Sequence, residues 1–436
     1  MKNAMFKFSA AVTLAAAATS AAYAGGFMLT EQSVAGLGRA YAGAGIVGDD
    51  LSAVWYNPAG MVLLPGTQFQ MGAVMAYLDL GVTAKKDMFG RPSTDTDNGA
   101  KHGVPIPNMF LTHQINDDMW FGIGVTVPFG MATEYKRTWA LADHGMNAEV
   151  KVFDINPNMA WRVTDTLSVG AGMSLQYVTA HFESAKNSGG NMAYGRLSAD
   201  GWAWGGNLGV MWQPTDTLRF GLAYRSQVNH HADGTYKFGI RGVKGIGADG
   251  KPIPGGNFDA KGYLLSANGK AEMSAPNVVT LTGTWEATQA LRLSALVRWT
   301  DWSSFDTLPV SNDIQMPGVG GTTKMPYHWK DSWLFTAGAD YKINDAVTVR
   351  AGAGYEISPV DDDKYRSATI PDTDRLWLSL GATWHVNNKL QGDFGLAYLK
   401  GIGDKGLYNE RTGEEVGEFD KLDAILVGAQ FVYRFD

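Results

Sequence analysis

The feature that most constrains the fold of this chain is an alternation of apolar with polar or small side chains, sustained over about ten residues at a time. In residues 346–357, alanine, valine, tyrosine and isoleucine alternate with threonine, arginine, glycine and glutamate. The same pattern runs through 217–228 and 375–386. Successive side chains of a strand point to opposite faces, so each stretch predicts a strand with one apolar face. Soluble sandwiches use strands of about 5–6 residues, whereas longer strands of this kind are typical of transmembrane barrels.

Fourteen such strands are predicted, and the connections between them fall into two kinds. Six connections are tight turns rich in asparagine, aspartate and threonine. They alternate with seven longer polar loops, near 83–105, 128–148, 185–199, 232–269, 306–330, 358–373 and 401–421. The predicted strands are 67–82, 106–115, 119–127, 149–163, 166–184, 200–213, 217–231, 270–286, 291–305, 331–343, 346–357, 374–386, 391–400 and 422–435. An even strand number with short turns at one end predicts an all-β fold, a 14-stranded antiparallel transmembrane β-barrel.

Tryptophans support the membrane assignment. Most of them fall near predicted strand ends or loop junctions, where amphipathic rings favour the headgroup level of a bilayer. Those counted as interfacial include Trp161, Trp212, Trp302, Trp329 and Trp384. Sheet packing is the alternative explanation for a minority of them.

The first 24 residues predict a cleaved export signal. Lysines at positions 2 and 7 give a positively charged start and precede a short apolar run at 8–18. Ala22-Tyr23-Ala24 then has the small-x-small pattern of a cleavage site. Cleavage after Ala24 would leave Gly25 as the amino terminus of the exported protein. An uncleaved anchor is the less favoured alternative, because the apolar run falls well short of the roughly 20 residues that a spanning helix needs.

Residues 25–66 fit neither a strand nor a solvated tail. Nine of them are glycine, and only Glu31, Arg39, Asp49 and Asp50 are charged. Such a backbone can fold tightly and lie close to other backbone, but its apolar side chains require an enclosure. We therefore predict three parts: a signal peptide at 1–24, an internal hatch, or plug, at 25–66, and the barrel at 67–436.

Composition and spacing argue against several other kinds of protein. The chain has no cysteine and a formal net charge of -7, so neither a disulfide framework nor a basic surface for nucleic acid is predicted. His230-His231 lacks the further ligands of a metal site, and Gly36-Leu37-Gly38 does not continue into a dinucleotide motif. No catalytic arrangement can be argued from spacing. We expect no enzymatic activity, no cofactor and no metal.

Short motifs follow one another along the chain and together resemble one known family. Within 25–66 they are Gly26-Phe27, Gly36-Leu37-Gly38-Arg39-Ala40-Tyr41 and Asn57-Pro58-Ala59. Further along they are Pro107-Asn108-Met109, Gly130-Met131-Ala132-Thr133-Glu134, Tyr224-Arg225-Ser226, the stretch 299–305 and the stretch 370–379. The set resembles the FadL family of outer-membrane long-chain fatty-acid transporters over almost the whole exported chain.

The resemblance implies a bacterial outer-membrane protein whose fourteen-stranded barrel is closed by the hatch and is not an open aqueous pore. It implies passive uptake of a long-chain fatty acid, which meets a groove between outer loops and then a pocket inside the barrel. The ligand would leave sideways into the bilayer, through a gap beside a kinked third strand. The implied partners are this hydrophobic ligand, outer-membrane lipid and lipopolysaccharide, and a monomer is expected.

In the hatch, the resemblance implies gating roles for Phe27 and for Asn57-Pro58-Ala59. Phe27 matches a phenylalanine whose ring occupies the inner pocket, so a ligand that displaces it would rearrange the hatch. A disordered terminal phenylalanine is the alternative. Asn57-Pro58-Ala59 matches a hatch motif placed next to the gap in the wall. Aquaporins also contain this tripeptide, but they need two copies and helical spans.

The predicted third strand ends with Gly122-Ile123-Gly124-Val125-Thr126-Val127-Pro128-Phe129-Gly130. Glycine or proline within a strand marks a bulge or an interrupted ladder. Gly122, Gly124, Pro128 and Gly130 are therefore candidate residues of the gap. Ordinary termination of the strand at Pro128 is the alternative interpretation.

A ligand carboxylate would favour a basic partner in the low-dielectric interior. Lys324 and Lys330 lie just before the predicted tenth strand, where the family places one such group, although the spacing differs slightly. By the strand alternation, Arg350 and Arg375 also point into the lumen, where such residues more often pair with acids.

Two further functions stay open. Relatives with the same hatch take up other hydrophobic compounds, such as monoaromatic hydrocarbons, and dependence on Lys324 and Lys330 would separate the two ligand classes. An outer-membrane lipase or protease would need no hatch, and hydrolysis of esters or peptides would reveal it.

Overall fold

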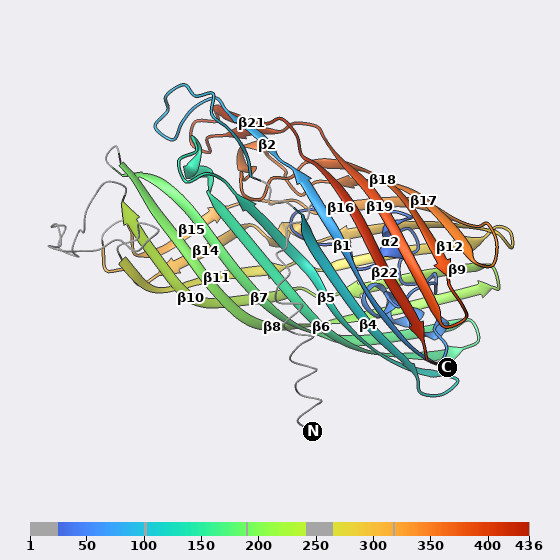
Figure 1. Ribbon diagram of the computed structural model, residues 1–436. Coiled ribbons are helices and arrows are strands. Elements are labelled where there is room, and N and C mark those ends of the chain that lie inside the picture. The colour runs from blue at the N-terminus through green and yellow to red at the C-terminus, as the bar shows by residue number, and fades with distance from the viewer. Residues whose placement is uncertain (1–24, 100–102, 189–190, 241–264, 317–318, 436) are drawn as a thin grey trace.

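The computed structural model of the chain describes residues 25–99, 103–188, 191–240, 265–316 and 319–435. The predicted export signal at 1–24 lies outside these residues. The dominant structure is an antiparallel sheet that closes on itself (Figure 1). Closure is direct, because Ala73 of the first strand pairs with Ala429 of the last.

The described wall contains fourteen strands, as the sequence predicts. It is built from eighteen segments, and four neighbouring pairs continue each other across a short break: β9 with β10, β11 with β12, β13 with β14 and β15 with β16. The segments are β1 (Thr67–Asp79), β4 (Val104–Gln114), β5 (Met119–Glu134), β6 (Asn147–Thr164), β7 (Leu167–Ser188), β8 (Asn191–Thr215), β9 (Leu218–Arg225), β10 (Val228–Ile240), β11 (Leu265–Ala275), β12 (Val278–Glu286), β13 (Leu291–Thr300), β14 (Thr307–Asn312), β15 (Gly321–Pro326), β16 (Ser332–Lys342), β17 (Val347–Ile357), β18 (Asp374–His385), β19 (Leu390–Ile402) and β22 (Asp423–Arg434). The six predicted tight turns connect strands at one end, which we call the turn end.

The alternation along each strand separates a polar interior from an apolar outer face. On β18 the outward Leu376, Leu378 and Leu380 are 43%, 60% and 61% exposed, whereas the inward Trp377 and Ser379 are buried. Exposed apolar side chains continue around the wall, and a surface of this extent is suited to the hydrocarbon of a bilayer. Within the described residues, no helix is long and apolar enough to cross a membrane.

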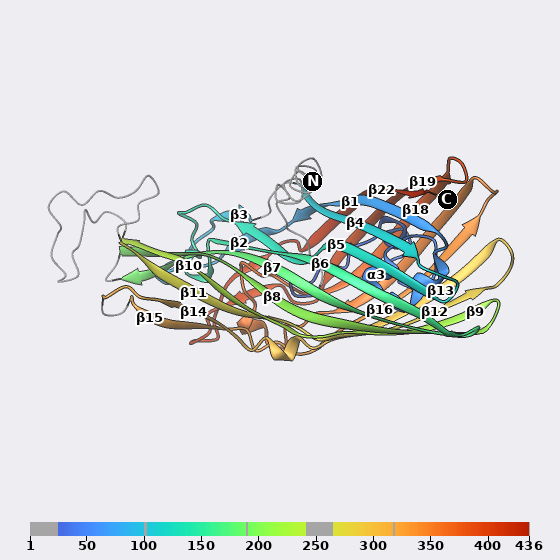
Figure 2. The same ribbon diagram turned by 90° about the horizontal axis from the view of Figure 1, so that it is seen from below.

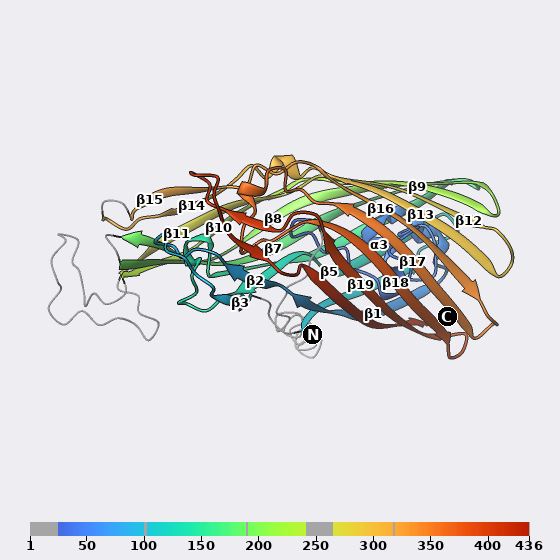
Figure 3. The ribbon, with the colours of Figure 1, turned by 90° about the horizontal axis from the view of Figure 1, so that it is seen from above.

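Several predicted long loops in fact contain parts of the wall. Residues 185–188 belong to β7 and residues 191–199 to β8, and these two paired strands extend one side of the wall (Figure 3). The inward Ala185, Met192 and Tyr194 belong there to an apolar cluster with outer-loop residues. These tertiary contacts stabilise the extended strands, and the local amino-acid composition does not reveal them. The predicted loop at 306–330 likewise contains β14 and β15.

A second, small sheet is formed mostly by segments that the sequence predicts to be loops, although its first strand begins within the predicted strand 67–82. It contains β2 (Gly81–Ala84), β3 (Thr96–Asn98), β20 (Gly406–Tyr408) and β21 (Glu415–Phe419), in the order β20-β21-β2-β3. Val82, Leu407 and Phe419 from this sheet share a buried apolar cluster with Trp139. The outer connections therefore have a core of their own, at the end opposite the turns (Figure 2).

The barrel encloses residues 25–66, which we call the N-terminal segment (Figure 1). It contains α2 (Val34–Leu37), α3 (Ala53–Tyr56) and the 3-10 helix η1 (Pro58–Leu63), and nearly all of its residues are buried. A Cβ at Gly352 of β17 would come within 2.2 Å of the Arg39 backbone, and one at Gly381 of β18 within 2.7 Å of Gly38. Only glycine allows two backbones to touch in this way.

Candidate functional site

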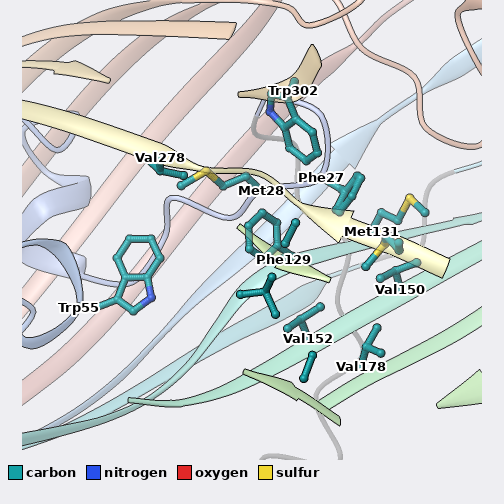
Figure 4. Packing of buried hydrophobic residues seen from close by; sticks show 14 of the residues in the cluster. Phe27, Met28, Trp55, Phe129, Met131, Val150, Val152, Val178, Val278 and Trp302 are labelled. Atoms are coloured by element: carbon teal, nitrogen blue, oxygen red, sulfur yellow. The ribbon is translucent and has the colours of Figure 1, made fainter. Parts of the chain in front are cut away.

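The side chain of Phe27 lies inside an aromatic cage, of which Figure 4 shows Trp302 and Phe129. Its ring centroid is 4.7 Å from that of Trp302, 5.3 Å from Phe305, 5.9 Å from Phe129 and 6.1 Å from Trp329. Aromatic rings attract one another at these separations, most strongly edge to face or offset. The Phe27 side chain is fully buried, so the alternative of a disordered phenylalanine is wrong.

Sequence reasoning missed the cage that surrounds Phe27. Trp302 and Trp329 are expected at the membrane interface, yet both are buried in the interior. A short 3-10 helix, η3 (Trp302–Ser304), interrupts the wall between β13 and β14 and ends the strand alternation there. The available signal is the position of Trp302 inside the 299–305 motif that carries the family resemblance.

The backbone of residues 27–29 pairs with β5 as a short extra strand. Met28 and Phe129 form an isolated antiparallel bridge. Two hydrogen bonds flank this bridge, from the Leu29 N–H to the Pro128 carbonyl at 2.8 Å and from the Gly130 N–H to the Phe27 carbonyl at 2.9 Å. The residue that fills the cage is therefore also bonded to the predicted gap region.

The wall is interrupted at the same place. β4 pairs with β5 only as far as Met109 opposite Val125. Residues 104–108 of β4 stay paired with β1, while β5 beyond Val125 stays paired with β6. The β4–β5 ladder therefore opens into a gap between 104–108 and the kinked part of β5.

A β-bulge accompanies the gap. The β5–β6 register shifts between Thr126 and Phe129, so that β5 carries one residue more than β6 over this stretch. β5 then continues to Glu134. The alternative of ordinary strand termination at Pro128 is therefore wrong, and the interrupted ladder is what the structure contains.

The side chain of Gln32 replaces the strand partner that Val127 lacks. Its amide nitrogen donates to the Val127 carbonyl at 2.8 Å, and its amide oxygen accepts the Val127 N–H at 3.4 Å. A carboxamide offers the same donor and acceptor as a peptide group. No sequence signal marks Gln32, because only the fold brings it to β5.

The predicted glycines of β5 serve two purposes. A Cβ at Gly122 would come within 2.5 Å of Met61 Sδ and 2.8 Å of Val54, and one at Gly124 within 2.9 Å of the Phe110 ring. The absence of a side chain at Gly122 thus lets α3 and η1 lie against β5. Gly130 takes part directly, through its hydrogen bond to the carbonyl of residue 27.

Asn57-Pro58-Ala59 contacts β7 and β8. The Asn57 amide nitrogen donates to the Val210 carbonyl at 3.1 Å, and the Ala59 carbonyl accepts the Ser168 hydroxyl at 3.1 Å. The Asn57 side-chain oxygen also accepts the Ala59 N–H and so caps η1. The motif docks the N-terminal segment on this part of the wall, and its expected position next to the gap stays a prediction.

Lys324 and Lys330 do not reach the interior. Lys324 is exposed on β15, and Lys330 is exposed and pairs with Asp361 at 3.4 Å. The expectation that these amines lie in a low-dielectric interior is therefore wrong. A cation that does contact the N-terminal segment is Arg298, which donates to the Thr30 hydroxyl at 2.8 Å.

Buried ion pairs tie the N-terminal segment to the wall near the turn end. Arg39 pairs with Asp49 at 2.6 Å and with Asp340 of β16 at 3.2 Å. Arg350 of β17 pairs with the same two carboxylates, at 2.9 Å and 2.7 Å. Although burial opposes it, the two guanidiniums hold the pKa of the Asp49 carboxyl well below its usual range. The prediction that Arg350 and Arg375 face the lumen and pair with acids is confirmed.

Replacement of Arg39 by methionine should loosen the N-terminal segment inside an intact barrel. The change leaves Asp49 and Asp340 buried with one guanidinium fewer, and breaking a buried pair in this way typically costs about 3–5 kcal/mol. We expect protease cleavage within 25–66 to accelerate roughly tenfold or more. Lys421→Met, which removes an exposed pair with Asp79, is the control and should leave cleavage unchanged. Equal cleavage in both variants would mean that Arg39 does not hold the segment.

The interior cavities differ in size and chemistry. A cavity of about 30 Å³ beside Met28, Trp55 and Arg298 has room for little more than water. A wider cavity of about 670 Å³ near the turn end is lined by ionic side chains, including Arg350 and Arg434. An alkyl chain cannot fit into the first without displacing side chains, and gains nothing from the second.

Comparisons with known proteins bear on the family and on the barrel fold. A family model described as outer membrane protein transport protein (OMPP1/FadL/TodX) matches residues 15–435. The long-chain fatty acid transport protein of Escherichia coli O6:H1 is 29% identical over 460 residues, covering 99% of each chain, and outer membrane protein P1 of Haemophilus influenzae is 29% identical, covering 91% of this chain and 90% of that one. The crystal structure of a Pseudomonas aeruginosa FadL homologue superposes with a TM-score of 0.81 at 25% identity, over 94% of this chain and 100% of that one. The Pseudomonas putida toluene transporter TodX, with a TM-score of 0.71 at 18% identity over 94% and 100% of the chains, supports the fold alone.

Proposed function

Because the chain belongs to the OMPP1/FadL/TodX family of outer-membrane transport proteins, we propose that it carries long-chain fatty acids across the outer membrane by passive diffusion. The ligand displaces Phe27 from the aromatic cage and leaves sideways between β4 and β5. The N-terminal segment is the hatch that this displacement rearranges. One observation carries the proposal: Phe27, whose ring fills the cage, also accepts a hydrogen bond from β5 at the gap through its carbonyl.

This coupling supports a hatch opened by the ligand. Phe27 and Leu29 lie on either side of the Met28–Phe129 bridge, so pulling the ring out of the cage strains both hydrogen bonds to β5. An alkyl chain that replaces the Phe27 ring would keep the cage filled with apolar atoms. The binding free energy of the ligand would therefore offset the free-energy cost of moving the segment.

A sideways path suits the chemistry of the ligand. Each CH₂ group removed from water is worth about 0.8 kcal/mol, and the gap opens towards hydrocarbon whereas the turn end is lined by ions. Transfer into the bilayer is downhill, so no energy source is required. We also propose that the protein works as a monomer, with its apolar face against lipid and its outer rim near lipopolysaccharide.

Uptake of monoaromatic hydrocarbons is the second candidate. The observation that favours it is the cage itself, because four aromatic rings around Phe27 fit a benzene ring as well as an alkyl chain. Both ligands use the same cage and gap, so the two candidates differ only in substrate class.

Uptake of labelled oleate and labelled toluene by cells that lack their own transporters tests the proposal. We expect cells that carry this chain to accumulate oleate faster than cells with an empty vector. Faster accumulation of toluene alone would favour the second candidate. If neither ligand enters faster although the barrel is assembled in the outer membrane, both are wrong.

Replacement of Lys324 and Lys330 by glutamine should have only a small effect on oleate uptake. Exposed charges contribute little and are screened by salt. At limiting oleate and low ionic strength we expect uptake to fall by at most about fivefold, with toluene uptake unchanged. Loss of oleate uptake to background would mean that a lysine meets the carboxylate inside the barrel.

A further inference from the structure

The backbone nitrogen of Gly25 lies in a buried cluster of charged side chains. The Gly25 N–H donates to Glu356 Oε1 at 2.9 Å, and the Gly26 N–H donates to Asp372 Oδ2 at 2.5 Å. Glu356 is the penultimate residue of β17 and Asp372 precedes β18, and both are almost completely buried. If the leader is removed as predicted, Gly25 is the first residue of the exported protein.

Carboxyl groups outnumber cations in this cluster. Arg375 of β18 pairs with Glu356 at 3.4 Å and with Asp372, and Arg298 of β13 pairs with Glu356 at 3.4 Å. Glu31 interacts electrostatically with Glu356 and both arginines, and within the described residues neither of its buried carboxyl oxygens accepts a hydrogen bond from another residue. Three carboxyl groups therefore face two guanidiniums. At full ionisation one negative charge has no partner.

We propose that this cluster is a binding site for the amino terminus that leader removal creates, with the ammonium group of Gly25 as its third cation. Hydrolysis of the peptide bond after Ala24 adds water, leaves a carboxylate on the leader and turns the Gly25 nitrogen into an ammonium group. That nitrogen already donates to Glu356, and as an ammonium group it has three donors. The inference rests on the predicted cleavage and not on the class of ligand transported.

Two glycines make the site reachable. Gly26 has a φ of 67°, and a Cβ there would come within 2.7 Å of the Trp302 ring and 2.8 Å of the Trp329 ring. A Cβ at Gly25 would come within 3.0 Å of Glu356 Oε1. The terminus can pass the aromatic cage because residues 25 and 26 have no side chains.

Charge balance gives the ammonium group a specific effect. Burial raises the pKa of Glu31 to about 8 and that of Asp372 to about 6. While Gly25 is still an uncharged amide, a proton on Glu31 keeps the cluster neutral, and the ammonium group would let all three carboxyls ionise. Arg366, which donates to the Asp372 carbonyl at 3.0 Å, is already paired with Asp363. Because an unpaired buried charge is costly, processing should fasten the N-terminal segment in the barrel.

The ionisation of the terminal amine in purified, processed protein tests the proposal. Acylation follows the fraction of free amine, so the pH midpoint for labelling of the Gly25 peptide, read by mass spectrometry, reports its pKa even if burial slows the reaction. Ordinary α-amines titrate at about 7.7–8.0. Carboxylates within about 4–6 Å favour the ammonium form, so we expect the midpoint to rise by about one pH unit or more. An ordinary or lowered midpoint would overturn the proposal.

Matched variants assign the shift to the cluster. Glu356→Gln keeps a hydrogen-bond acceptor but removes a charge, and should lower the midpoint by about one pH unit or more. Glu415→Gln removes an exposed pair with Lys85 and should leave it unchanged. An alanine inserted before Gly25 moves the amine by about 3.8 Å and should give an ordinary midpoint. This insertion tests the proposal independently if the Glu356→Gln variant fails to assemble. A midpoint that neither the substitution nor the insertion changes would overturn the proposal. No ligand is present, so failure of fatty-acid uptake would leave this result intact.

Discussion

When Met28→Cys and Phe129→Cys are combined, uptake of oleate and of toluene should fall to background in the oxidised protein and recover on reduction. The two residues form an antiparallel bridge flanked by hydrogen bonds on both sides, which is the geometry of a non-hydrogen-bonded pair. Such pairs have Cα atoms about 4.5 Å apart, within the range of a disulfide. The cross-link would fasten the N-terminal segment to β5, so that Phe27 could not leave the cage and the gap could not open.

The chain allows clean controls for this cross-link. It has no cysteine of its own, so the introduced pair has no competing thiol. The reduced double variant carries the same substitutions and controls for the loss of the Phe129 ring. Met71→Cys with Phe431→Cys joins β1 to β22, which are already paired, and its oxidation should not change uptake. Normal uptake by a fully cross-linked 28–129 variant would mean that the N-terminal segment need not move.

The barrel is predictable from the sequence because each of its strands faces two different environments. Leu376, Leu378 and Leu380 meet lipid while the residues between them meet the lumen, so the environment itself imposes a period of two. The tight turns are predictable for a local reason, since asparagine and aspartate satisfy turn geometry within a few residues. The upper parts of β7 and β8 are not predictable in this way, because outer loops cover their inner face.

The candidate site is predictable only where a motif marks it. Phe27 and Gly130 lie in motifs and Pro128 is a proline within a predicted strand, and the structure brings all three together at the Met28–Phe129 bridge. Gln32 and Trp329 also lie beside these residues, but only the fold brings them there. The sequence around each of them has no local pattern that predicts the contact.

The lysines illustrate the limit of a position inferred from family spacing. Between β15 and β16, Tyr327 and Trp329 are buried whereas His328 and Lys330 are exposed. The period of two that starts from the exposed Lys324 therefore also places Lys330 on the exposed face, and the expectation of interior lysines failed because it followed the family spacing and not the strand pattern.

Deletion of Pro128 should close the gap in the wall and abolish uptake. β5 carries one residue more than β6 between Thr126 and Phe129, so removing one residue restores a regular register. Proline cannot donate to a ladder, so its loss also removes the residue of β5 here that lacks an N–H, whereas Pro105 and Pro107 of β4 could take part only through their carbonyls. β5 beyond Val125 could then pair with residues 104–108 of β4. A ligand released from the cage would meet a continuous wall, and uptake should fall at least tenfold, to background.

Deletion of Val163 is the matched control for this experiment. β6 carries one extra residue relative to β7 between Arg162 and Thr164, so this deletion also removes a bulge, but one at the turn end and far from the gap. Both variants should keep the heat-dependent electrophoretic mobility of an assembled barrel, and only the Pro128 deletion should stop uptake. Normal uptake by an assembled Pro128 deletion would mean that the ligand does not leave between β4 and β5. The ion-lined cavity at the turn end would then be the path to test, and a hydrophobic acid would have to cross it as an anion paired with Arg350 or Arg434.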